Sequence, residues 1–136
     1  MLRRVSALVI KQNMVLLVKL KDQDRMLPRA TWIFPTVSIT EDDSPRRVIN
    51  ILLDRIGIDY KLKGDTFRYV PAENPKLSYV LYAVDYVKGE PDVASLFQTY
   101  KWVQIRDIVA YSTSFMDANI SKYLNGIADT AEKFRN

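Results

Sequence analysis

The side chains best placed for chemistry share one side of a helix that the sequence predicts over residues 45–56. At about 100° per residue, one face of this helix, about 100° wide, carries Arg47, Ile51, Asp54 and Arg55. The guanidinium group of arginine suits bidentate contacts with phosphate. Magnesium needs several oxygen ligands, which a single aspartate beside an arginine does not supply. The pattern therefore favours anion binding over metal binding.

The composition narrows the chemistry further, because the chain contains no cysteine and no histidine. Disulfides, thiolate zinc sites, cysteine nucleophiles and an imidazole general base are excluded. The net charge of +4 mildly favours anionic partners such as nucleotides. The basic residues are spread along the chain without a dense run, so nucleic acid is the less favoured partner.

The length of 136 residues predicts a single domain spanning residues 1–136. No apolar run approaches the roughly 20 residues of a membrane span, and the stretch after Arg4 lacks the cleavage site of a signal peptide. We therefore expect a cytoplasmic protein with no membrane partner. A homodimer is compatible with the sequence.

The predicted helix at residues 45–56 has clear start and stop signals. Ser44 can accept a hydrogen bond from a free backbone N–H, and Pro45 suits the first helical position. Gly57 is a natural stop. The apolar residues between them recur at helical spacing, which predicts that Leu52 lies in the core.

The remaining elements are predicted to be mostly strands. Two runs rich in valine and leucine, residues 5–10 and 14–20, read as a β-hairpin. Further strands are expected at residues 32–35, 61–70, 77–87 and 100–103. A second amphipathic helix follows around Ile120 and Leu124, with fraying expected from Ala128 onward.

Residues 32–58 resemble the box of the Nudix family, which reads Gly, five residues, Glu, seven residues, then Arg-Glu-aliphatic-any-Glu-Glu-any-Gly-aliphatic. Gly57-Ile58 anchors this pattern without a gap, and Trp32-Ile33-Phe34-Pro35 is similar to the tryptophan and Phe-Pro pair that lead into the box. Lys101-Trp102-Val103 resembles the family's late tryptophan strand. The resemblance implies an α/β sandwich with a mixed sheet, the box helix on one side and the C-terminal helix on another.

The chain departs from the family pattern at most of its chemical positions. Substituted positions of the box hold Thr36, Val37, Asp42, Asn50, Ile51, Asp54 and Arg55. In the family, the helix glutamates hold divalent cations that neutralise a diphosphate and generate the attacking hydroxide. Within the box, only Asp54 and Asp42 are candidate metal ligands. The resemblance therefore implies no metal cofactor, with magnesium needed only if some activity remains.

The leading interpretation is a Nudix-type protein with weak or absent pyrophosphohydrolase activity that binds a nucleotide or another phosphorylated ligand. Arg47, Asp54 and Arg55 would form the binding face, with Arg29 contributing from the loop before residue 32. Against this stands the interpretation that the two helix arginines are merely solvated, with Asp54 pairing locally and Ile51 extending the core.

Two other functions stay open. One is an active magnesium-dependent pyrophosphohydrolase of nucleoside diphosphates linked to another group, with metal ligands from Asp42, Asp54 and a loop carboxylate such as Glu73 or Glu90. The other is a non-catalytic module that binds a protein or RNA partner.

Overall fold

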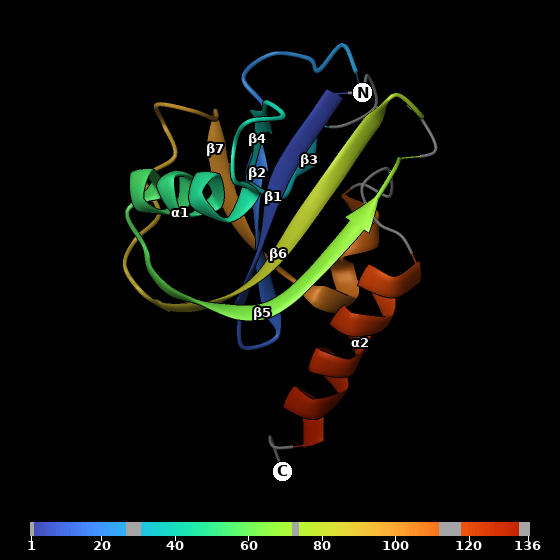
Figure 1. Cartoon of the computed structure of the whole chain (residues 1–136). Helices are drawn as coiled ribbons and strands as arrows, with labels where there is room; N and C mark the ends of the chain where they lie inside the picture. Colours follow the sequence, from blue (N-terminus) through green and yellow to red (C-terminus); the bar gives the residue numbers. More distant parts are fainter. Residues whose placement is uncertain (1, 27–30, 72–73, 112–117, 134–136) are drawn as a thin grey trace.

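A seven-stranded sheet with two helices forms the body of the molecule (Figure 1). The computed structural model describes residues 2–26, 31–71, 74–111 and 118–133. The elements in chain order are β1 Leu2–Lys11, β2 Met14–Lys19, β3 Trp32–Ile33, β4 Thr36–Ile39, α1 Pro45–Ile56, β5 Asp59–Tyr69, β6 Leu77–Lys88, β7 Thr99–Gln104, the 3₁₀ helix η1 Ile105–Ala110, and α2 Ala118–Lys133.

The sheet is mixed, as the sequence predicted. Its main path runs β3-β2-β1-β6-β5, while β4 pairs with β1 and β7 pairs with β2. The long central pair of β1 and β6 is parallel, and every other pairing is antiparallel. The side chains of residues 5–10 in β1 are all buried. Five of these six residues are apolar, the exception being Ser6, and such a run is typical of a strand covered on both faces.

The two helices lie on opposite faces of this sheet. Phe67 in β5 pairs with Leu81 in β6, and its ring contacts Tyr123 of α2. Tyr60 in β5 pairs with Tyr86 in β6, and its hydroxyl reaches α1. Leu81 and Tyr86 are an odd number of residues apart in a regular strand, so their side chains point to opposite faces.

Helix α1 begins and ends where the sequence predicted. The Oγ of Ser44 accepts a hydrogen bond of 3.4 Å from the backbone N–H of Arg47. Gly57 closes the helix in a left-handed conformation, with φ of 84°, which an L side chain rarely adopts. The buried face of the helix is formed by Ile49, Leu52, Leu53 and Ile56. The prediction that Leu52 lies in the core is confirmed.

One expectation about the chain's path was confirmed only in part, and another position gains definition. Thr36 and Val37, which stand where the family has glycines, begin the short strand β4, which is hydrogen-bonded along β1. Helix α2 continues past Ala128 to Lys133 instead of fraying there. The candidate caps of α2 at residues 112–114 lie outside the described residues.

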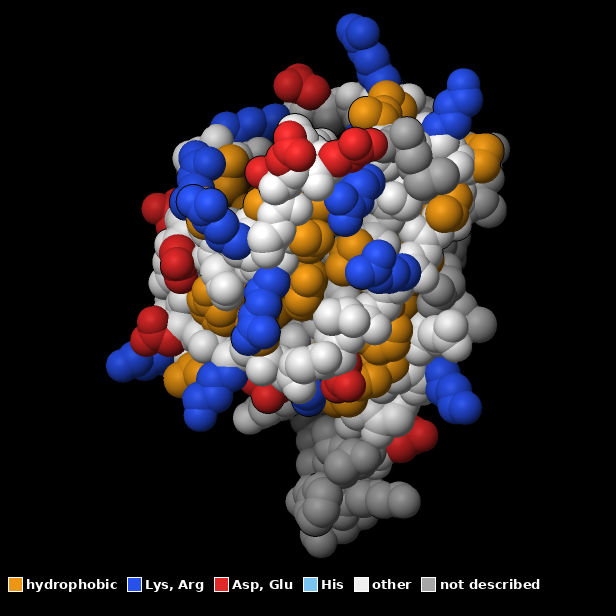
Figure 2. Space-filling model, in the orientation of Figure 1, with side chains coloured by type: hydrophobic (Ala, Val, Ile, Leu, Met, Phe, Trp, Pro, Cys, Tyr) orange, Lys and Arg blue, Asp and Glu red, His pale blue; other side chains and the backbone are white. Residues whose placement is uncertain are grey.

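The charged side chains do not form a continuous basic surface on the face shown in Figure 2. Lysine and arginine side chains there are interspersed with acidic and hydrophobic ones. None of the helices in the described part of the chain is long and apolar enough to cross a membrane.

Candidate functional site

The outer face of α1 holds the residues that the sequence analysis singled out. Arg47, Ile51, Asp54 and Arg55 are all exposed, opposite the side of the helix that enters the core. Ile51 retains 48% of its accessible surface, so the expectation that it extends the core is wrong. A large aliphatic side chain is therefore half exposed to solvent on this face, between Arg47 and Arg55 in the sequence.

Beside this face lies a pocket of about 130 Å³. It is lined from α1, from β4 and from the loop that joins β6 to β7 by Thr36, Val37, Val48, Ile51, Leu52, Arg55, Leu96 and Phe97. Six of these eight residues are apolar. The loop residues Leu96 and Phe97 were missed by the sequence analysis, because nothing in their local pattern ties them to a helix forty residues earlier.

The two polar residues of the pocket differ in what they offer a ligand. The Thr36 hydroxyl donates to the carbonyl oxygen of Phe34 at 2.7 Å and lies 2.6 Å from the Oγ of Ser6. Its hydrogen-bonding capacity is largely taken up inside the protein. Arg55 is exposed and forms no ion pair among the residues that the structure describes. The pocket thus combines apolar walls with one available cation.

Arg47 does not line this pocket. It lies eight residues before Arg55, a rise of about 12 Å along the helix, and it faces the turn that precedes α1. There, Asp43 accepts hydrogen bonds from the backbone N–H and the hydroxyl of Thr40. These bonds, with a smaller contribution from the charge of Arg47, lower the pKa of the Asp43 carboxyl. The structure therefore brings Arg55, and not the pair of arginines, to the pocket.

Asp54, the candidate metal ligand of the helix, is held by a tyrosine. The hydroxyl of Tyr60 donates to Oδ1 of Asn50 at 2.8 Å and lies 3.3 Å from Oδ1 of Asp54. Burial, followed by the charge of Asp54, raises the pKa of Tyr60. Asp54 therefore has a local contact, as one interpretation of the sequence expected, but the contact is with this hydroxyl and not with an arginine.

The candidate ligands that the structure describes, Asp42 and Glu90, do not form a carboxylate cluster with Asp54. Within the described residues there is no group of three or more carboxylate, histidine or cysteine side chains that could hold a metal ion. Asp42 lies in the exposed turn before α1. Glu90 accepts a hydrogen bond from the hydroxyl of Tyr100. Glu73 and Arg29 lie outside the described residues.

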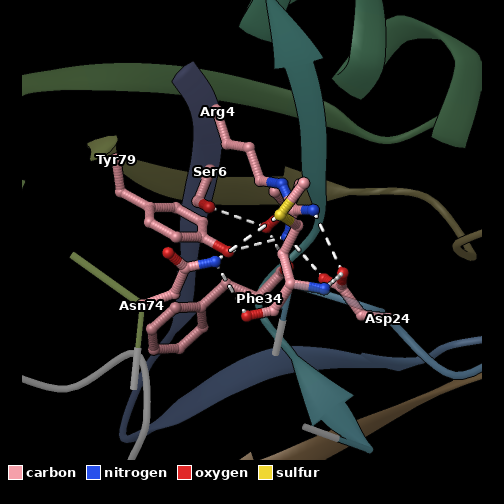
Figure 3. Close-up of polar contacts among 8 residues, drawn as sticks. Arg4, Ser6, Asp24, Phe34, Asn74 and Tyr79 are labelled. Carbon is pink, nitrogen blue, oxygen red and sulfur yellow. Dashed lines mark hydrogen bonds and ion pairs between the residues drawn. The ribbon is translucent and has the colours of Figure 1, made fainter. Parts of the chain in front are cut away.

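A separate polar cluster, also missed by the sequence analysis, ties the loop after β2 to the sheet (Figure 3). The two terminal nitrogens of Arg4 donate to the two carboxylate oxygens of Asp24 at 2.5 and 3.1 Å, and one of them also donates to the hydroxyl of Tyr79. Burial lowers the pKa of Arg4, but the bonds to Asp24 and Tyr79 outweigh it and raise the pKa overall. Asn74 donates to the carbonyl oxygen of Met26 at 3.2 Å.

A wider hollow of about 620 Å³ lies between β5 and α2. Its walls include the cations Arg68 and Lys122 and the tilted ring pair of Phe67 and Tyr123, whose centroids are 5.1 Å apart. At its rim, the hydroxyl of Tyr123 donates to Oδ2 of Asp65 at 3.1 Å. Burial and this bond raise the pKa of Tyr123 to about 12.

Comparison with known proteins identifies the fold through solved structures alone. No family model matches the sequence. No curated protein matches it either. Solved structures match over nearly the whole chain. An Ap4A hydrolase from C. elegans, solved as a binary complex, aligns with a TM-score of 0.67 at 11% identity, covering 98% of this chain and 100% of that chain.

Two further structures agree with this match. A MutT protein from Methanosarcina mazei Go1 aligns with a TM-score of 0.62 at 17% identity, covering 97% of this chain and 95% of that chain. A NUDIX hydrolase from Nitrosomonas europaea aligns with a TM-score of 0.59 at 15% identity, covering 95% and 88%. Likeness at these identities defines the fold and leaves the chemistry to the residues of the site.

Proposed function

We propose that this chain, which has the Nudix fold that its sequence predicted, binds a small phosphorylated ligand at the outer face of α1 and has weak or no pyrophosphohydrolase activity. Arg55 is the residue that contacts the phosphate. Arg47 adds long-range attraction from the first turn of the helix, and no divalent cation is required.

One observation carries the proposal: Arg55 lies exposed at the rim of a pocket whose other walls are almost entirely apolar. A cation there would be repelled by the guanidinium and would meet few oxygen ligands. A phosphate would meet a planar donor that can form two parallel hydrogen bonds. The composition of α1 supports the same conclusion, because Asp54 is the only carboxylate of this helix and a single carboxylate is too few oxygen ligands for magnesium.

The alternatives are an active magnesium-dependent hydrolase and a module that binds a protein or RNA. Only the fold supports an active hydrolase, because the solved structures with a similar fold include hydrolases. Nothing specific in the described surface favours a macromolecular partner, and the basic side chains of Figure 2 are scattered.

The proposal is tested by titrating ADP into the protein with a chelator present, using isothermal calorimetry. The unmodified protein should bind ADP without magnesium, and binding should weaken as the salt concentration rises. Arg55→Glu should abolish binding without creating turnover. Arg46→Glu is the matched control, because Arg46 is exposed on the same helix and, nine residues away, points about 180° from Arg55.

Three results would contradict the proposal. ADP binding that requires magnesium would favour the enzyme. Equal loss of ADP affinity in Arg46→Glu and Arg55→Glu would mean that net charge, and not a contact with Arg55, determines the affinity. Unchanged affinity in Arg55→Glu would mean that the arginine is merely solvated.

A further inference from the structure

We infer that the pocket beside α1 receives an apolar group of the ligand, so that the bound molecule is a small amphiphilic anion: a benzene-sized apolar group that carries a phosphate. This inference rests on the proposed function, because it assigns the phosphate to Arg55. It adds the part of the ligand that the pocket itself recognises.

The lining of the pocket is the first argument. Val37, Val48, Leu96 and Phe97 come from three separate segments of the chain and converge on one hollow. Ile51 completes the wall and keeps 48% of its surface exposed. Exposed aliphatic surface beside a pocket favours an apolar occupant, since binding removes that surface from water.

The size of the pocket limits what can enter. Its volume of about 130 Å³ is similar to that of an engineered cavity of about 150 Å³ that binds benzene. A single six-membered ring or a short branched acyl group fits. A complete nucleoside does not, so a nucleotide would leave most of its sugar or base outside.

The polar groups fix where the anion lies. Thr36 has already committed its hydroxyl to Phe34 and Ser6. Arg55 is therefore the polar group of the lining that can meet the ligand, and it lies on α1 one turn from Ile51. An apolar group inside the pocket places its phosphate next to the guanidinium. The apolar group alone would not contact Arg55, and phosphate alone would not fill the pocket.

Three probes separate the contributions of the apolar group and of the phosphate to the affinity. They are phenyl phosphate, inorganic phosphate and phenol, each titrated by calorimetry with chelator present. Phenyl phosphate should bind about tenfold or more tightly than either of the others, since filling an apolar pocket by even one methylene is worth about tenfold. Arg55→Gln should weaken both phosphate-bearing probes. Arg46→Gln should weaken neither.

A second variant tests the apolar contact without endangering the fold. Ile51→Ser changes an exposed side chain of the pocket wall and should reduce the affinity for phenyl phosphate several-fold while leaving inorganic phosphate unchanged. Val87→Ser is its control, because Val87 is 51% exposed in β6 and does not line the pocket. It should leave both affinities unchanged.

The possible failures are distinguishable. If inorganic phosphate binds as tightly as phenyl phosphate, or if Ile51→Ser and Val87→Ser behave alike, the apolar subsite is wrong and the proposed function stands. If phenol binds as tightly as phenyl phosphate, or if no probe binds, the anion contact fails, and the proposed function fails with it.

Discussion

The hydroxyl of Tyr60 lies 3.3 Å from Oδ1 of Asp54, the only carboxylate of α1. This contact joins the first strand after the helix to the helix face on which the fold's hydrolases are expected to hold their metal ligands. The same face carries Arg55 and borders a pocket with mostly apolar walls.

Replacing Leu52 with alanine should destabilise the protein by about 2–5 kcal/mol, because Leu52 is 4% exposed and its removal leaves a cavity as well as lost transfer energy. Ile51→Ala is the control on the same helix. Ile51 is 48% exposed, so its replacement should change stability by less than about 1 kcal/mol. Chemical denaturation of both variants measures the difference, and similar losses in the two would mean that the faces of α1 are misassigned.

Two glycines should respond to alanine in opposite directions. Gly57→Ala should destabilise the protein by about 1 kcal/mol, because φ of 84° is unfavourable for an L side chain. Gly126 lies within α2, where a Cβ atom would meet nothing within 4 Å. Gly126→Ala should stabilise the protein by about 0.5–1 kcal/mol. A thermal melt compares them, and stabilisation by Gly57→Ala would contradict the left-handed end of α1.

The stability of the protein should depend on Tyr123 at high pH. Burial and the bond to Asp65 raise the pKa of Tyr123 from 10.0 to about 12 in the folded state. A raised folded-state pKa means that the contribution is fully present below pH 10 and is lost as the pH rises towards about 12. Tyr123→Phe should therefore lose less stability across this interval than the unmodified protein.

Urea unfolding at several pH values between 10 and 12 measures this difference. Asp65→Asn retains the tyrosine but removes the negative charge of its partner, so its loss of stability should lie between the two. Parallel curves for the unmodified protein and Tyr123→Phe would contradict the bond between α2 and β5.

The sequence was sufficient for α1 because the signals that define this helix are local. Ser44 and Gly57 mark its ends through their own backbone preferences, and the spacing of apolar residues identifies its buried face. The mixed sheet followed from the resemblance to a known family and not from periodicity alone.

The pocket could not be predicted in the same way. Its walls bring Thr36 and Phe97 together across sixty residues of sequence, and the second comes from a loop without a regular pattern. The bond between Arg4 and Asp24 has the same origin, since a loop must fold back onto β1 before the two meet. The interpretation in which Ile51 extends the core failed because, although an isoleucine on a helix usually enters the core, this one is exposed beside a pocket.

We propose that the outer face of α1 binds no divalent cation, and thermal melting with magnesium tests this proposal. A ligand raises the melting temperature only in proportion to RT ln(1 + [L]/Kd), so millimolar magnesium should leave the unmodified protein unchanged. Tyr60→Phe, which frees Asp54 from its hydroxyl partner, should respond no more strongly, because one carboxylate beside Arg55 still cannot hold the ion. A saturable rise in the melting temperature with magnesium, lost in Asp54→Asn, would contradict the claim and restore the hydrolase interpretation.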